Sequence, residues 1–263
     1  MGEEHRVLVS VKAFVVAAVV AIIYAEALIA FVDPLLGVAL DAVIIATLAS
    51  HRYIFTPRGT QAPPLSISVA CVALSLLPIM RLLSFTLPAK RLEEVAWYEL
   101  IGAPILAVLA VLCRVDPDLG RLLRNPGRML VQGAIALTGV PLGLAGYLIT
   151  REAALDAGSP ALTYVLGPLV LIVFAAFTEE LLFRGALMVA LERIGGQWMA
   201  LACSALMFAA FHLDGGHLAY VPFAAGYGFA FGVAVRRTGS LTGVAAAHGL
   251  LNVGMIILWP HLL

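Results

Sequence analysis

The chain has 263 residues, of which 62% are hydrophobic and only 12% are charged, and its mean hydropathy is +1.01. These values exclude a soluble globular domain and indicate a polytopic α-helical membrane protein. Basic and acidic residues balance at 16 each, so the total charge predicts no nucleic-acid partner. Only Lys12 and Lys90 are lysines, and the chain is rich in Ala, Leu, Val and Gly, which indicates a prokaryotic origin.

Nine apolar segments approach the ~20 residues that a helix needs to cross a bilayer. They span residues 9–31, 35–50, 65–87, 95–114, 129–150, 160–194, 197–213, 217–235 and 240–259. The second and seventh segments are short, which leaves open an arrangement of eight spans with one re-entrant or interfacial piece. We therefore expect an all-α transmembrane bundle of eight to nine helices.

The connections between these segments carry Gly, Pro, Asp and Asn, and none is long enough for a separate soluble domain. We expect one integral membrane domain, with N-terminal transmembrane helices over residues 1–159 and a catalytic helical core over residues 160–263. With nine spans, eleven basic residues fall on the side of the N-terminus and three on the other side. The positive-inside rule then predicts a cytoplasmic N-terminus, in the inner membrane of a prokaryote.

Few polar side chains interrupt the spans of the first half. They are Glu26, Asp41, Arg81 and Glu99, and each is expected to pair with a neighbour or to reach an interface rather than to act directly. In the second half, the GxxxG pattern over residues 228–232 predicts a close contact between helices within the fold.

Glu179, Glu180 and Arg184 stand out because they lie inside the apolar segment 160–194. An ionisable side chain at the centre of a membrane helix costs about 2.5 to 3.5 kcal/mol on insertion scales, so three within six residues indicate a function. Residues four apart share a helix face, so Glu180 can pair with Arg184, while Glu179 is turned about 100° away and is free to face the bundle interior. The alternative is a buried ion network that only fixes helix packing.

Three more polar groups lie in later spans: His212 near the end of the seventh, and His248 with Asn252 on one face of the ninth. At ~1.5 Å of rise per residue, Glu179 and His212 both lie about 22 Å from the inner ends of their helices, Asn252 about 18 Å and His248 about 12 Å. These depths fall within one slab of the bilayer. A single water-filled pocket is therefore able to collect all four groups.

Such a pocket supports hydrolysis of an amide bond. A carboxylate and an imidazole that share a water can turn it into a nucleophile by general-base action. A second imidazole and a carboxamide are suited to stabilising the oxyanion of a tetrahedral intermediate. No Ser or Cys forms a recognisable nucleophile motif with these groups, so a covalent acyl-enzyme is disfavoured.

Three motifs occur in order within the last 85 residues: E-E-x-x-x-R (Glu179, Glu180, Arg184), F-x-x-x-H (Phe208, His212) and H-x-x-x-N (His248, Asn252). In this arrangement the chain resembles the CPBP family of intramembrane endopeptidases, also called the Abi or CAAX protease family, which includes the type 2 CAAX prenyl endopeptidases. The resemblance covers about residues 160–260. It implies that Glu179 and His212 activate the attacking water, that His248 and Asn252 form the oxyanion site, and that Glu180 and Arg184 form a supporting ion pair.

The resemblance leaves the need for a metal open, because the family is described both as metalloproteases and as glutamate-dependent. Glu, His, His and Asn are able to hold a divalent cation such as zinc. The zinc signature H-E-x-x-H is absent and only two imidazoles are present, so we expect no cofactor. The implied partners are the lipid bilayer and a membrane-anchored protein or peptide substrate, cleaved at a CAAX-type site or at a C-terminal sorting tail.

Other functions stay open at this point. Many bacterial members of the family resemble bacteriocin-immunity or protein-sorting proteases rather than enzymes of prenylated proteins. A proton-coupled transporter or channel would use Glu179, His212 and His248 as a proton relay. A proteolytically silent scaffold would use the fold only to bind a membrane partner. The sequence predicts no oligomeric state.

Overall fold

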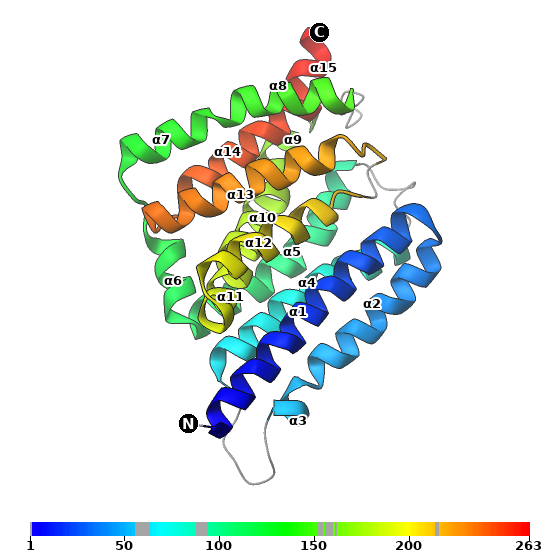
Figure 1. The fold of residues 1–263 in the computed structure, drawn as a ribbon. Coiled ribbons are helices and arrows are strands. Elements are labelled where there is room, and N and C mark those ends of the chain that lie inside the picture. Colours follow the sequence, from blue (N-terminus) through cyan, green and yellow to red (C-terminus); the bar gives the residue numbers. More distant parts are fainter. Residues whose placement is uncertain are drawn as a thin grey trace.

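A computed structural model describes residues 2–55, 64–87, 94–151, 155, 160, 162–213 and 216–263. Within these ranges the chain is almost entirely helical and contains no β-strand. The helices pack against one another as one bundle, with the N-terminus at one end and the C-terminus at the opposite end (Figure 1).

In the first half of the bundle, the described residues form eight helices. They are α1 Gly2–Phe31, α2 Pro34–Ala49, α3 His51–Phe55, α4 Leu65–Thr86, α5 Glu94–Val115, α6 Pro117–Arg124, α7 Met129–Leu137 and α8 Gly139–Thr150. α1 and α2 lie side by side at one edge of the bundle (Figure 1), and both contact α4. The turn between α1 and α2 forms because Asp33 accepts hydrogen bonds from two N–H groups of the first turn of α2, while Pro34 fills its first position.

The second half begins with one long helical segment in which α-helical and π-helical turns alternate. Its parts are η2 Leu162–Leu166, α9 Gly167–Val170, η3 Leu171–Phe177, α10 Thr178–Glu180, η4 Leu181–Leu187 and α11 Met188–Gly195. Then follow α12 Gln197–Ala210, α13 Tyr220–Thr238, α14 Thr242–Val253, η6 Gly254–Leu258 and α15 Trp259–Leu262. In the π-helical turns each backbone N–H donates to the carbonyl five residues earlier. The side-chain hydroxyl of Thr178 makes a further hydrogen bond over the same distance along the chain, to the carbonyl of Val173 at 3.0 Å.

In the part of the chain that the structure describes, six helical segments are long and apolar enough to cross a membrane. They are Val9–Phe31, Leu65–Thr86, Tyr98–Val115, Met129–Thr150, Thr163–Gly195 and Thr242–Leu262. Two shorter apolar helices, Pro34–Ala49 and Gln197–Ala210, accompany them. All nine segments expected from the sequence are helical, so the all-α membrane bundle is confirmed and the chain is an integral membrane protein. Four expectations stay predictions: the count of eight to nine spans, the cytoplasmic position of the N-terminus, the prokaryotic origin, and the division into N-terminal helices and a catalytic core near residue 160.

Two predicted spans differ in detail from the observed helices. The span expected over 129–150 is divided at Thr138, whose N–H bonds to the carbonyl of Ile135, three residues back. Pro141 explains the division, because it has no N–H to offer to the carbonyl of Leu137. The span expected over 197–213 ends earlier, since α12 stops at Ala210.

A polar contact ties α6 to the long helical segment. Asp116 caps α6 by accepting from the N–H groups of Asp118 and Leu119, and it also accepts from Arg193 of α11 at 2.9 Å. The hydrogen bond from Arg193 holds the pKa of the Asp116 carboxyl below its ordinary value of 3.8. The connection between α5 and α6 is thereby joined to the helix that carries the acidic pair.

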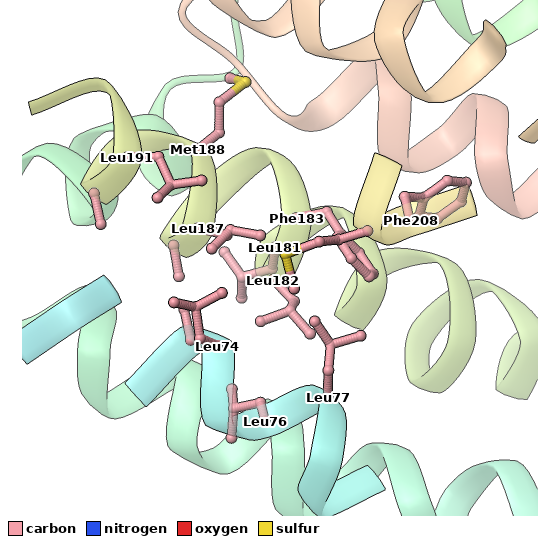
Figure 2. Close-up of a cluster of buried hydrophobic side chains, with 14 of the residues drawn as sticks. Leu74, Leu76, Leu77, Leu181, Leu182, Phe183, Leu187, Met188, Leu191 and Phe208 are labelled. Atoms are coloured by element: carbon pink, nitrogen blue, oxygen red, sulfur yellow. The ribbon is translucent and has the colours of Figure 1, made fainter. Parts of the chain in front are cut away.

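The two halves of the chain share one hydrophobic core. Buried side chains from α1, α4 and α5 pack with those from η4, α11, α12, α13 and α14 in a single cluster. Figure 2 shows Leu74 and Leu77 of α4 close to Leu181 and Leu182 of η4. Gly102 of α5 permits a close crossing with η3, because a Cβ there would lie 2.3 Å from the carbonyl oxygen of Phe174.

Candidate active site

Glu180 is the centre of a buried polar cluster. Its Oε1 accepts a hydrogen bond from Arg184 Nη1 at 2.9 Å, the ion pair expected from their spacing. The same oxygen accepts a second hydrogen bond from His248 Nδ1, also at 2.9 Å. All three side chains are buried within the bundle. The structure therefore joins the first and third sequence motifs through one carboxylate oxygen.

His248 reaches both glutamates through its two ring nitrogens. A carboxylate only accepts hydrogen bonds, so the proton between Glu180 and His248 belongs to Nδ1. The opposite nitrogen, Nε2, lies 3.9 Å from Oε2 of Glu179. Glu180 thus sets the orientation of the ring and directs Nε2 toward the second acid. The sequence had linked Glu180 to Arg184 alone, because the contact with His248 joins residues 68 positions apart.

Glu179 differs from its neighbour in its surroundings. Its Oε2 is buried and makes no hydrogen bond to any of the described residues, and its side chain is 14% exposed. A carboxylate without a hydrogen-bond donor in an apolar interior is costly, which makes it a strong acceptor for a proton or for a water. Oε2 of Glu180 is likewise buried without a partner, but Oε1 of Glu180 is held by two donors, whereas no donor among the described residues holds Glu179.

His212 lies in the turn directly after α12, whereas the predicted span placed it inside the helix. Its backbone N–H bonds to the carbonyl of Ala209 at 3.1 Å, and its Nδ1 bonds to the carbonyl of Phe208 at 2.8 Å. Because a carbonyl can only accept, Nδ1 carries the proton and Nε2 remains an acceptor. Both histidines are thus held through Nδ1 and present Nε2 for chemistry.

The ring of Phe208 lies between these groups. Its centroid is 4.8 Å from that of His212 and 5.7 Å from that of His248, and the Arg184 guanidinium carbon is 4.1 Å from it. The second motif is therefore in contact with the other two through its Phe. A cation held over an aromatic face is also stabilised by the ring, which supports burial of Arg184.

Two tyrosines of α13 complete the aromatic surroundings. Tyr220 lies 5.4 Å from His212 and Tyr227 lies 5.9 Å from His248, measured between ring centroids, and their hydroxyls are 3.4 Å apart. Sequence reasoning did not single them out. The sequence pattern that could have indicated them is their seven-residue spacing, which puts both rings on one face of a helix.

Asn252 lies one turn beyond His248 on α14, and 9% of its surface is exposed. Among the described residues its carboxamide has no hydrogen-bonding partner, so it is near the cluster in the fold without being tied to it. Among the described residues, neither Asn252 nor His212 forms a hydrogen bond or ion pair with another predicted site residue, and His212 reaches the cluster through the ring of Phe208.

The GxxxG pattern of α13 makes the close contact that the sequence predicted. A Cβ at Gly228 would lie 2.8 Å from Arg184 Nη2 and 3.1 Å from Phe208 Cδ1. A Cβ at Gly232 would lie 2.8 Å from the side chain of Leu201 on α12. Gly228 therefore provides the room in which the guanidinium lies.

Sequence reasoning also missed that Arg81 of α4 contacts the turn before His212. Its guanidinium pairs with Glu26 of α1, as expected for a lone intramembrane acid, with Nη2 2.7 Å from Glu26 Oε2. It also donates to the backbone carbonyl of Phe211, the residue before His212. The only signal in the sequence was a basic residue inside an apolar span.

The donor set fits a metal poorly. Across the ranges that the structure describes, no three His, Cys, Asp or Glu side chains are placed to hold one ion. Nδ1 of each histidine is already occupied by a protein acceptor. The donors that remain are the two Nε2 atoms, the Glu179 carboxylate and the amide oxygen of Asn252, and in the described residues the His and Glu side chains do not form a three-ligand group.

Comparison with known proteins covers the segment that carries the cluster. A search of curated proteins and a search of solved structures gave no match to the chain. Residues 161–254 match the family model described as type II CAAX prenyl endopeptidase Rce1-like. The match includes all six predicted site residues, Glu179 to Asn252, and so confirms the resemblance to the CAAX protease family and indicates a membrane protease in general. Over residues 161–254 the chain is therefore similar to the type II CAAX prenyl endopeptidase Rce1-like proteins.

Proposed function

We propose that the chain is an intramembrane endopeptidase that hydrolyses a peptide bond of a membrane-anchored protein with a water activated by Glu179. The observation that carries the proposal is the position of His248, whose Nδ1 is held by Glu180 while its Nε2 faces Glu179. This arrangement sets an oriented imidazole beside an available carboxylate, inside an apolar interior that strengthens electrostatic interactions.

Each group has a role in the proposed reaction. Glu179 accepts a proton from the attacking water, and His212, with Nε2 as an acceptor, shares in holding that water. The water oxygen then attacks the carbonyl carbon of the scissile bond and forms a tetrahedral intermediate. When that intermediate collapses, the leaving amine takes up the proton and departs.

The oxyanion of the intermediate needs hydrogen-bond donors. His248 can donate through Nε2 only when both ring nitrogens carry protons, and the Glu180 carboxylate at Nδ1 balances the charge of that form. The amide of Asn252, one turn away, is the second proposed donor. Arg184 keeps the Glu180 carboxylate in place through the ion pair at 2.9 Å.

The proposed substrate class is a protein held in the bilayer near its cleavage site. A site buried in a helical bundle suits a segment that is itself membrane-associated, such as a CAAX-type end or a C-terminal sorting tail. The family match supports this class of substrate.

The test is cleavage of a reporter membrane peptide by purified protein in detergent or liposomes. Glu179→Gln and His212→Ala should each abolish cleavage while the protein stays folded, as measured by its thermal unfolding. Glu99→Gln is the matched control, because it removes an exposed acid of the membrane helix α5. Full cleavage by either site variant would refute the mechanism, and pH-driven flux in proteoliposomes that the same variants remove would favour a proton-coupled transporter instead.

A further inference from the structure

Arg81 connects the N-terminal half of the chain to the candidate active site. It lies on α4, outside the segment 161–254 that matches the family model, and it is 8% exposed. Its Nε is 2.9 Å from both carboxylate oxygens of Glu26 on α1. A buried cation needs such a partner, since an unpaired one would be costly to desolvate. Glu26 therefore fixes the direction in which the guanidinium points.

The guanidinium also reaches the turn that carries His212, through the same Nη2 that pairs with Glu26. Nη2 donates a hydrogen bond to the carbonyl oxygen of Phe211, and the guanidinium carbon lies 4.4 Å from the centroid of the Phe211 ring. Arg81 thus holds this residue twice, once through its backbone and once through its side chain. The contact joins positions 130 residues apart.

The carbonyl of Phe211 needs a partner from outside the helix. α12 ends at Ala210, and carbonyls at the C-terminal end of a helix have no intrahelical donor. Buried carbonyls without donors are destabilising, so the guanidinium replaces the missing bond. Because the next residue is His212, this carbonyl helps to fix the backbone from which the imidazole extends to the carbonyl of Phe208.

The charge of Arg81 also acts within the site. Its guanidinium is near enough to Glu179 and to His212 to interact electrostatically with both. Figure 2 shows the neighbouring part of α4 lying close to η4, the helical turns that follow the acidic pair. The cation is therefore part of the surroundings of the two groups that are proposed to activate the water.

We propose that Arg81 is a positioning residue for the proposed hydrolysis: anchored by Glu26, it holds the turn at Phe211 and thereby positions His212. The inference rests on the proposed function. It makes the N-terminal helices a working part of the site, in addition to the segment that matches the family.

The test compares three variants with a matched control. Arg81→Met removes the cation and its donors, Arg81→Lys keeps a positive charge and one donor group, and Glu26→Gln removes only the anchor. Arg193→Gln is the control, because it breaks another arginine–carboxylate contact, with Asp116, away from the His212 turn. Each variant is measured for kcat and KM on the reporter peptide, for thermal unfolding, and for hydrogen exchange of the backbone amides of residues 207–213.

Arg81→Met should lower kcat by about 10-fold to 100-fold, the range expected for loss of a hydrogen bond from a charged donor, with KM nearly unchanged. It should also speed exchange in residues 207–213. The kcat of Arg81→Lys should be higher than that of Arg81→Met, and the kcat of Glu26→Gln should lie between those of Arg81→Met and the wild type. Arg193→Gln should lower thermal stability while leaving kcat and this exchange unchanged.

Unchanged exchange in Arg81→Met would overturn the inference, and so would a kcat loss of the same size in Arg193→Gln, since that would reflect general destabilisation. A rise in KM at constant kcat would also overturn it. If wild type and Glu179→Gln were equally inactive, the proposed function would fail by itself, and the exchange measurement would still support or overturn the anchoring of the turn.

Discussion

Replacement of Gly228 by Ala tests the packing around Arg184. The added Cβ would lie 2.8 Å from Arg184 Nη2 and 3.1 Å from Phe208 Cδ1, both closer than side chains normally approach. Arg184 has no exposed surface, so its guanidinium can only move at the expense of its bond to Glu180. Overpacking of this kind costs about 1 to 3 kcal/mol. Ala in place of Gly gains about 1 kcal/mol of helix propensity, so a net loss of about 0 to 2 kcal/mol is expected.

Gly226 is the matched control on the same helix. A Cβ there meets nothing within 4 Å among the described residues, so Gly226→Ala should keep the propensity gain of about 1 kcal/mol without a clash. Thermal unfolding in detergent should therefore separate the two variants by about 1 to 3 kcal/mol. Cleavage of the reporter peptide should fall only in Gly228→Ala. Equal stability and equal cleavage in both variants would refute the idea that Gly228 makes room for the guanidinium.

Three further outcomes are expected. Glu180→Gln should destabilise the fold by about 3 to 5 kcal/mol, because it leaves Arg184 without its carboxylate, and an unchanged unfolding temperature would contradict this. Arg193 lowers the pKa of the Asp116 carboxyl in the folded state. The pair should therefore stabilise the fold at pH values above 3.8, the ordinary pKa of an Asp carboxyl, and this stabilisation should be lost as the pH falls through the lower pKa of the folded state. Asp116→Asn should remove that part of the acid-induced loss in a pH series of unfolding temperatures. Excess EDTA should leave peptide cleavage intact, and activity that is lost with EDTA and restored by added zinc would show that the site holds a metal.

The sequence predicted what depends on local spacing and composition. Apolar runs located the long helices of the described bundle, because hydrocarbon leaves a chain few other ways to satisfy its backbone, whereas the short helices α3 and α6 fell in predicted connections. The pairing of Glu180 with Arg184 followed from four-residue spacing. Three motifs, read together, identified the family over the segment that the comparison later matched.

Contacts between distant segments were beyond that reasoning. Spacing could not show that His248 shares an oxygen of Glu180 across 68 residues, or that Arg81 meets Phe211 across 130. Both contacts depend on which helices pack against each other. The apolar composition of the helices is compatible with many packing arrangements and therefore does not predict which one forms. The π-helical turns were missed for a similar reason, since no composition distinguishes them from α-helical turns.

Those wide turns on either side of Glu179 have a consequence for how this protein can tolerate changes in length. η3 and η4 each contain more residues per turn than an ordinary helix, so the heading of the acids depends on the number of residues upstream as well as on their identity. Deleting one residue from η3 would let its wide turns rewind as an ordinary α-helix, in which fewer residues cover nearly the same rotation, so the carboxylates would keep roughly their direction. A related chain that has lost one residue here would keep its hydropathy profile, all three motifs and the direction of its acids, whereas loss of one residue from an ordinary α-helical turn would redirect them by about 100°.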